Sequence, residues 1–399
     1  MRLTPEEKAM LAGDFGPGVK RAMEIVVALG KIYGARELVP IASAQVAGVS
    51  YKNLGDAGLE FLRQWAREGA RVRVPTTLNP AGMDLTRWRE LGIPEDFARR
   101  QMEVIRAFEA MGVTTTCTCT PYLVGNTPGP GEHIAWSESS AVSFANSVLG
   151  ARTNREGGPG ALAAAIVGRT AKYGLHLDEN RVANYVVDVR CPLRDEADFG
   201  ALGYMVGRRV KNAVPYFRGV GGERTRLRAL GAAMAASGAV ALYHVEGVTP
   251  EARTEIISPD AETIVVESLS EGYAALNSPV ERIDLVSIGC PHASLAEIEE
   301  VARWLEGKRV KAALWITTAR RTRELAEERG FVEAIEAAGG RVLADTCLVV
   351  APVEALGFRS LATNSAKMAL YAPSHCGLAV RFGSLEQCLE AAVRGWPAD

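Results

Sequence analysis

Long apolar runs and the cysteine spacing of a disulfide framework are both missing from this sequence. No apolar run approaches the roughly 20 residues that cross a bilayer, and the N-terminus lacks the apolar segment of a signal peptide. We therefore expect a cytoplasmic protein that does not contact the membrane. The seven cysteines are odd in number and follow no dense pattern, so reduced thiols are expected.

The chain also lacks an excess of either charge. It carries 45 basic and 47 acidic residues, a net charge of −2. This balance creates no general basic field to attract a polyanion, so nucleic-acid binding is not expected. Neither a G-x-G-x-x-G motif nor a Walker A sequence is present, so the sequence indicates neither a dinucleotide nor a nucleoside triphosphate as ligand.

The pattern that is present is typical of an α/β protein. Of 399 residues, 48% are hydrophobic, enough to bury a large core in two or three lobes. From about Gly34, short β-branched runs alternate with stretches of helical period, which predicts parallel sheets covered by helices. We place lobe boundaries near 215 and 345. Strands are expected at 72–76, 113–116, 185–189, 240–243, 283–288, 312–317, 341–343 and 360–362, and helices at 94–111, 133–149, 224–237, 294–305 and 319–338.

A first helix is also expected directly after Thr4. Thr4 can cap it, Pro5 suits the first helical position because no N–H is needed there, and Glu7 completes a capping box.

Three cysteines, Cys119, Cys290 and Cys347, follow predicted strands. Ligands bind beyond the carboxyl ends of strands in open α/β sheets, so three segments can deliver thiolates to one point. The alternative is that each cysteine is an ordinary buried hydrophobe. The prolines and polar residues beside them favour a ligand role, because core strands rarely contain such neighbours.

Soft thiolates suit an iron–sulfur cluster or zinc. A structural zinc site usually has four ligands and a close C-x₂-C pair, which this sequence lacks. Cys117 and Cys119 form a C-x-C pair, whose side chains point to opposite faces of an extended chain. We therefore expect one of these two residues, and not both, to be a ligand.

A second polar segment spans residues 131–155. In the predicted helix, Ser139, Ser143, Asn146 and Ser147 share one face. A solvated face normally carries Lys and Glu, so small hydroxyls and an amide indicate a binding surface, although a solvated helix remains the alternative. Two arginines follow the helix, where guanidinium groups can hold a carboxylate or phosphate.

A third polar segment follows the predicted strand 360–362. Asn364 and Ser365 stand at a strand-to-helix turn, where backbone N–H groups can bind an anion, and Lys367 adds a positive charge. A simple helix cap at Asn364 or Ser365 explains the segment equally well. The segment around Ser50 is similar.

Taken in order, these segments resemble the aconitase X family over nearly the whole chain. The resemblance implies an aconitase-like large subunit, with two or three α/β/α lobes around a cleft that contains a cluster. Its metal ligands would be Cys119, Cys290 and Cys347, with Cys117 as the position that can replace Cys119. The segments that carry the likeness are Cys119–Tyr122, Gly131–His133, Ala151–Arg155, Gly238–Leu242, Gly289–His292, Asp345–Cys347 and Asn364–Lys367.

The resemblance also implies a mechanism. A [4Fe–4S] cluster held by three thiolates leaves one iron open to act on the substrate hydroxyl. The resemblance implies that the catalytic base is a serine on a swivelling domain, which we expect on a separate small subunit, so this chain alone would be an incomplete enzyme. His133, His292 and Lys367 are the candidate catalytic residues of this chain. The candidate substrate-binding residues are Ser50, Tyr51, Lys52, Asn126, Glu138, Ser139, Asn146, Arg152, Asn154, Arg155, Asn364 and Ser365.

Two activities are familiar in the family: dehydration of mevalonate 5-phosphate in an archaeal mevalonate pathway, and dehydration of cis-3-hydroxy-L-proline. A phosphate plus a carboxylate needs several cations, whereas an imino acid needs one cation and an acidic or carbonyl partner. Lys52, Arg152, Arg155 and Lys367 therefore favour the phosphorylated substrate. A non-enzymatic iron–sulfur or RNA-binding relative and a structural zinc protein remain as alternatives.

Overall fold

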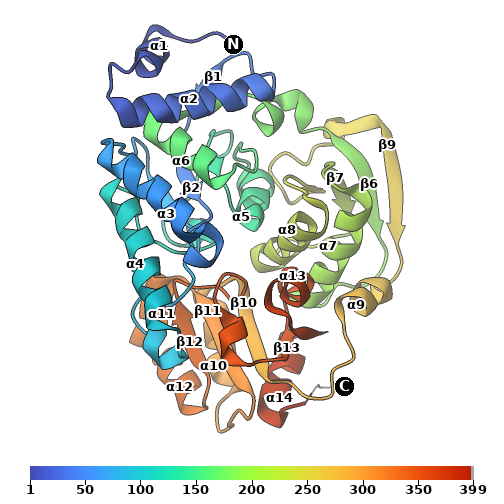
Figure 1. The fold of residues 1–399 in the computed structure, drawn as a ribbon. Coiled ribbons are helices and arrows are strands. Elements are labelled where there is room, and N and C mark those ends of the chain that lie inside the picture. Colours follow the sequence, from blue (N-terminus) through green and yellow to red (C-terminus); the bar gives the residue numbers. More distant parts are fainter. Residues whose placement is uncertain (397–399) are drawn as a thin grey trace.

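The computed structural model describes residues 1–396 and has a mixed α/β architecture with four sheets (Figure 1). The first part of the chain contains a parallel sheet of order β3-β2-β4, in which Ala44 pairs with both Thr76 and Ala135. β1 and β5 form a separate antiparallel pair. The elements of this part are α1 (Pro5–Ala12), α2 (Pro17–Ile32), β1 (Leu38–Pro40), β2 (Ala44–Val46), α3 (Tyr51–Arg67), β3 (Thr76–Leu78), α4 (Glu95–Ala110), β4 (Ala135–Trp136), α5 (Ser139–Phe144), α6 (Gly158–Val167) and β5 (Arg169–Ala171).

The second part of the chain is built on a four-stranded parallel sheet of order β8-β7-β6-β9. Two helices, α7 and α8, pack closely against each other beside this sheet, on the right of Figure 1. The elements are β6 (Ala183–Val189), α7 (Glu196–Val210), β7 (Pro215–Arg218), α8 (Arg224–Gly238), β8 (His244–Val245), β9 (Ile257–Val266) and α9 (Ser270–Leu276).

The third part contains a five-stranded parallel sheet of order β12-β11-β10-β13-β14, at the bottom of Figure 1. Its helix α13 packs against α7 and α8, which joins the third part to the second. The elements are β10 (Leu285–Ala293), α10 (Leu295–Trp304), β11 (Ala313–Thr318), α11 (Arg320–Glu328), α12 (Phe331–Ala337), β12 (Arg341–Ala344), β13 (Ser360–Thr363), α13 (Ala366–Cys376), β14 (Ala379–Phe382) and α14 (Leu385–Arg394).

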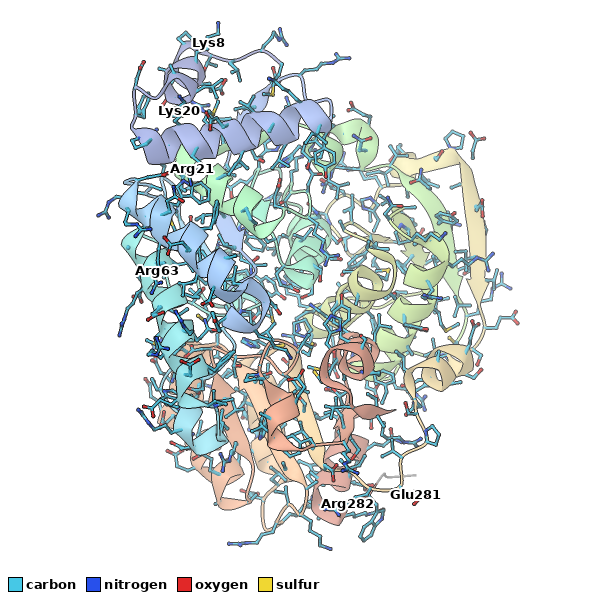
Figure 2. The ribbon with its side chains drawn as sticks, in the orientation of Figure 1. Lys8, Lys20, Arg21, Arg63, Glu281 and Arg282 are labelled. Atoms are coloured by element: carbon cyan, nitrogen blue, oxygen red, sulfur yellow. The ribbon has the colours of Figure 1, made fainter. Side chains whose placement is uncertain are left out.

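One apolar core connects the sheets of the second and third parts. It includes Phe199 and Phe217 from the second part and Leu285 and Leu361 from the third, all nearly inaccessible to solvent. Charged side chains lie on the outer faces, as the six labelled residues of Figure 2 illustrate. Within residues 1–396, no helix combines the length and apolarity that crossing a membrane requires.

Several predicted elements are confirmed by the structure, and others are wrong. Thr4 and Glu7 form the expected capping box at the start of α1. The predicted helix 319–338 is two helices, because Gly330 adopts a φ of 75° between them. The predicted helix 133–149 begins only at Ser139, because residues 135–136 pair with β2, and it ends in a π-helical turn.

Three of the predicted strands are also wrong in position. β3 begins at Thr76, where the strand 72–76 was expected to end, and β8 begins at His244, after the expected strand 240–243. In the segment 113–116, Thr114 forms only an isolated bridge to Thr77. Val113 and Val240 are buried without ladder pairing, so burial explains their apolar character.

Candidate active site

A cavity of about 200 Å³ lies between the carboxyl ends of two parallel sheets. From the three-stranded sheet, residues that directly follow β2, β3 and β4 line it. From the five-stranded sheet come Cys290 on β10, Cys347 after β12 and Lys367 after β13. This is the edge of an open α/β sheet at which ligands bind. The lining residues are Ala47, Asn79, Pro80, Cys119, Ser137, Glu138, Ser139, Arg155, Cys290, Cys347, Val349, Val350, Lys367 and Tyr371.

The three predicted ligand cysteines all line this cavity. Cys290 lies where the register of β10 shifts between Ile288 and Ala293, so it is not part of the regular ladder. Cys119 has a neighbouring donor, because the backbone N–H of His292 points at its Sγ at 3.2 Å. Cys117 instead packs into the apolar core of the first part and does not line the cavity. The structure therefore places Cys119, and not Cys117, with the other two cysteines.

The cysteines lie in a buried but partly cationic environment. Burial and the Glu138 carboxylate together raise the pKa of Cys119 to about 12, although the charge of Lys367 opposes both. A hydrogen bond from Cys347 lowers the pKa of Cys290, and the charge of Lys367 lowers it further against the effect of burial. Lys367 thus favours the thiolate forms that bind metals.

The arrangement fits a group larger than a single metal ion. Within residues 1–396, no three His, Cys, Asp or Glu side chains lie close enough together to hold one ion. Two buried hydroxyls close in sequence to Cys119 and Cys347, Tyr122 Oη and Thr346 Oγ1, have no hydrogen-bond partner among these residues. Buried polar atoms are normally paired, so these hydroxyls indicate a group that accepts hydrogen bonds there. An iron–sulfur cluster, with thiolate ligands around it and sulfides that accept hydrogen bonds, fits both observations.

A buried ion pair stands on one wall of the cavity. Lys367 Nζ donates to the Oε1 of Glu138, and both side chains are about nine-tenths buried or more. Burial alone would raise the pKa of Glu138, but the Lys367 charge and hydrogen bonds from Lys367, Ser140 and the Ala141 N–H lower it to about 2. The carboxylate raises the pKa of Lys367 in turn, although burial opposes this. Glu138 is therefore ionised and Lys367 is protonated at neutral pH.

Arg155 is the other cationic residue of the cavity wall, and its side chain is exposed to the cavity. Within the described chain it makes no ion pair with a carboxylate, so its charge is available to a ligand. Asn364 and Ser365 lie close by, in a small pocket on another side of Cys290. Ser365 also caps α13, because its hydroxyl accepts the Met368 N–H at 3.1 Å.

The two candidate catalytic histidines, His133 and His292, are not among the residues that line the cavity. His292 is fully buried, with Nδ1 2.9 Å from Thr118 Oγ1 and Nε2 2.8 Å from the Thr346 carbonyl. Because a carbonyl oxygen can only accept a hydrogen bond, Nε2 of His292 carries the N–H and already donates it to Thr346. His133 lies 2.9 Å from His176 through their Nδ1 atoms.

Two candidate cations are also paired away from the cavity. Lys52 Nζ contacts Glu354 at 2.6 Å and the carbonyl of Ala351 at 3.2 Å. Arg152 pairs with Asp178. Neither residue lines the cavity, so neither supplies free charge to it.

The remaining candidates hold backbone or neighbouring side chains in place. Four of them hydrogen-bond to main-chain carbonyls, and Tyr51 pairs with Asp56 at 3.0 Å. The four are Ser50 (to Val350, 2.8 Å), Asn126 (to Ala44, 3.3 Å), Asn146 (to Thr153 and Ala241, both 2.9 Å) and Asn154 (to Tyr173, 3.1 Å).

The sequence analysis missed Gln45, Asn79 and Ser137. Gln45 Oε1 accepts the backbone N–H of Glu138 at 2.9 Å, and its Nε2 donates to Asn79 Oδ1 at 3.2 Å. Asn79 and Ser137 line the cavity. Asn79 and Ser137 directly follow β3 and β4, which the sequence did not predict at these positions, and Gln45 lies within β2, so no sequence signal pointed to them.

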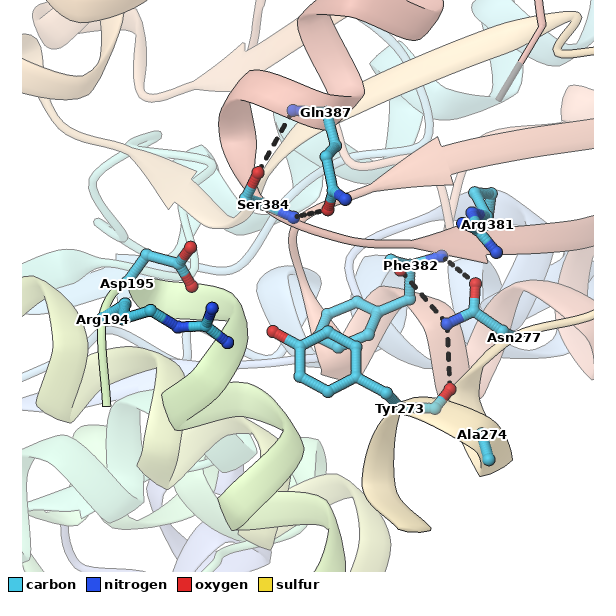
Figure 3. A pocket seen from close by; sticks show the side chains of 9 residues that line it. All are labelled: Arg194, Asp195, Tyr273, Ala274, Asn277, Arg381, Phe382, Ser384 and Gln387. Carbon is cyan, nitrogen blue, oxygen red and sulfur yellow. Dashed lines mark hydrogen bonds between the residues drawn. The ribbon is translucent and has the colours of Figure 1, made fainter. Parts of the chain in front are cut away.

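A larger cavity, of about 610 Å³, lies between α7, α9 and α14 and contains no cysteine (Figure 3). Its polar groups already have partners: Arg194 binds Asp198 at 3.0 Å, and Asn277 donates to the Tyr273 carbonyl at 2.9 Å. Size alone therefore does not identify the reactive site, and the cysteine-lined cavity is the candidate.

Comparison with known proteins finds matches over nearly the whole chain. Models of the aconitase X first, second and third domains match residues 1–179, 183–271 and 283–394. The phosphomevalonate dehydratase large subunit of Methanothermobacter thermautotrophicus is 55% identical, over 93% of this chain and 94% of that protein. A cis-3-hydroxy-L-proline dehydratase of Pseudomonas aeruginosa is 39% identical, over 99% of this chain and 70% of that protein. The crystal structure of Thermococcus kodakaraensis aconitase X in its holo-form is 51% identical, with a TM-score of 0.92 over 98% of this chain and 100% of that one.

Proposed function

This chain belongs to the aconitase X family, and on that premise we propose that it acts as the large subunit of a hydro-lyase that dehydrates mevalonate 5-phosphate to trans-anhydromevalonate 5-phosphate. The observation that carries the hydro-lyase reaction is the cavity in which three cysteines meet a free guanidinium group, that of Arg155. Soft thiolate ligands for a metal group, placed beside a cation that can bind an anion, suit the dehydration of an anionic hydroxy acid.

Family membership suggests an iron–sulfur cluster as cofactor. We propose a [4Fe–4S] cluster held by Cys119, Cys290 and Cys347. When bound, such a cluster supplies a Lewis-acidic iron for the substrate hydroxyl. The cavity and the two unpartnered hydroxyls close in sequence to Cys119 and Cys347 support this assignment.

The residues of this chain have distinct proposed tasks. Arg155 binds an anionic group of the substrate and orients it. Lys367 Nζ carries a proton that it can donate to the departing oxygen, and the buried Glu138 carboxylate keeps that nitrogen protonated. Removal of water from a carboxylic acid builds up negative charge, so these fixed cations also stabilise the reacting state.

The base that removes the substrate proton is proposed to come from a partner. The relatives are named as large subunits, which implies a small-subunit partner. Of the residues that line the cavity, Glu138 is the one carboxylate and none is a histidine. Because Glu138 is already bound to Lys367, we assign the base to a swivelling domain on the small subunit.

Charge alone supports the phosphorylated substrate less strongly in the structure than in the sequence. Lys52 and Arg152 are paired outside the cavity, so Arg155 and Lys367 are the cations on its wall. Sequence identity carries the choice instead, because the relative named for cis-3-hydroxy-L-proline is the more distant one.

The test is anaerobic assembly of this chain with its small subunit, followed by NMR detection of product. We expect dehydration of mevalonate 5-phosphate by the pair, none by the isolated chain, and at least a hundredfold lower kcat/KM for free mevalonate, because the loss of two charged hydrogen bonds, each worth about 1.5–3 kcal/mol, costs about 3 kcal/mol or more. A kcat/KM for cis-3-hydroxy-L-proline equal to or above that for mevalonate 5-phosphate would overturn the proposed substrate. Robust turnover by the isolated chain would overturn the proposed origin of the base.

A further inference from the structure

Ser137 has an unusual hydroxyl for a residue on a cavity wall. Its Oγ is buried and has no hydrogen-bond partner within residues 1–396, yet the residue lines the cavity that contains the cysteines. Buried hydroxyls are normally paired, because an unpaired one has lost its hydrogen bonds to water and gained none. The unpaired Oγ therefore indicates a ligand that completes the pair.

The two serines that follow closely in the chain differ from Ser137 in this respect. The hydroxyls of Ser139 and Ser140 both donate to the Glu138 carboxylate, at 3.3 and 2.6 Å. The Ser137 backbone is fixed by its N–H, which donates to the Gln45 carbonyl at 3.0 Å. With its backbone held, Ser137 can turn its hydroxyl towards a ligand in the cavity by a change of side-chain rotamer alone.

Arg155 lines the same cavity as Ser137, and its backbone lies beside the segment that contains Ser137. The backbone of Arg155 forms a parallel bridge with that of Trp136, the residue before Ser137. The Arg155 side chain reaches the same cavity and pairs with no carboxylate in the described chain. A guanidinium fork beside a hydroxyl donor is a recognised way to bind a carboxylate or a phosphate.

We propose that Ser137 is a substrate-binding residue, and that Ser137 Oγ and the Arg155 guanidinium together bind one anionic group of the substrate. The shared chemistry is an anionic oxygen, which can belong to the carboxylate or to the phosphate. The inference rests on the proposed function, since that function supplies a substrate with both groups.

The test compares Ser137→Ala with Ser143→Ala in the assembled two-subunit enzyme. Ser143 is a matched control because its Oγ is also buried and unpartnered, but it packs towards Gly231 of α8 and does not line the cavity. Loss of a hydrogen bond to a charged group predicts about a tenfold higher KM for mevalonate 5-phosphate in Ser137→Ala. Ser143→Ala should keep the wild-type KM, and Ser137→Thr, which retains a hydroxyl, should recover most of the loss. A KM for Ser137→Ala within twofold of wild type, or an equal rise in Ser143→Ala, would overturn the inference.

Calorimetric titration of the cluster-loaded large subunit separates the two sources of the anion. If Ser137→Ala weakens the binding of inorganic phosphate and leaves the affinity for free mevalonate unchanged, the site binds the phosphate group. The reverse result assigns the site to the carboxylate. Unchanged affinity for both ligands refutes the inference. If the assembled wild-type enzyme turns out not to dehydrate mevalonate 5-phosphate, the proposed function fails, while these titrations still decide the role of Ser137.

Discussion

Replacement of Lys367 by methionine should lower the free energy of unfolding by about 3–5 kcal/mol, because it leaves the Glu138 carboxylate buried without its cation. The pKa shift of Glu138 gives a free energy of similar size. A Glu138 pKa of about 2, against an ordinary value of 4.5, corresponds to about 3 kcal/mol of preference for the ionised form. Because the pKa is lowered on folding, this stabilisation is complete above pH 4.5 and is lost as the pH falls towards 2.

The assay is anaerobic urea denaturation, followed by circular dichroism, of preparations with equal iron content. The control is Lys172→Met, which removes a lysine from a more exposed pair, with Nζ 3.1 Å from Glu37 Oε1, and should cost at most about 1 kcal/mol. The double variant Glu138→Gln/Lys367→Met should recover most of the loss, since it removes both charges. The reasoning is refuted if Lys367→Met is no less stable than the control variant, or if the double variant is as unstable as the sum of its single changes.

Three further predictions concern the metal site, the substrate and the pH dependence of stability. Cys290→Ser should lose its iron, because a hydroxyl is a poor replacement for a soft thiolate, whereas Cys388→Ser, in the core beneath α14, should retain it; iron analysis decides this. Arg155→Ala should raise the KM for mevalonate 5-phosphate about tenfold, while Lys52→Ala, whose lysine is already paired, should leave it within twofold. Burial raises the pKa of Glu156 to about 7, so the free energy of unfolding of the wild type should fall as the pH rises from 4.5 to 7. Glu156→Gln should remove that pH dependence and be up to about 3 kcal/mol more stable than the wild type above pH 7. A wild-type stability that does not change with pH in this range would contradict the prediction.

Local signals in the sequence predicted the elements whose ends are set by local chemistry. The capping box of Thr4 and Glu7 forms as predicted, and Ser294 caps α10 in the same way. The segment 113–116 was misjudged, since a β-branched run does not reveal whether a partner strand will be present. Strand pairing depends on residues far along the chain, which no local pattern records.

The candidate site could also be predicted only in part. The three cysteines were expected to meet because each follows a predicted strand, and strand ends of parallel sheets share an edge. They do line one cavity, although Cys347 alone follows a regular strand: Cys290 lies within β10, and the segment before Cys119 forms only an isolated bridge. The sequence could not show which of the candidate cations remain unpaired. Lys52, for example, pairs with the carboxylate of Glu354, which lies 302 residues further along the chain. The isolation of the Ser137 hydroxyl was equally hidden, since it depends on what Gln45 and Glu138 already bind.

The separation of the cavity walls along the chain has a consequence for biosynthesis. One wall is complete once Arg155 has emerged from the ribosome, but the opposite wall needs Cys347 and Lys367, close to the end of synthesis. Domains that emerge early fold early, so the first part of the chain can fold before the other two cysteines of the cavity, Cys290 and Cys347, have been synthesised beside Cys119. Assembly of the metal centre therefore belongs to the completed chain, and a nascent chain truncated before Cys347 should fold its first sheet yet capture no iron.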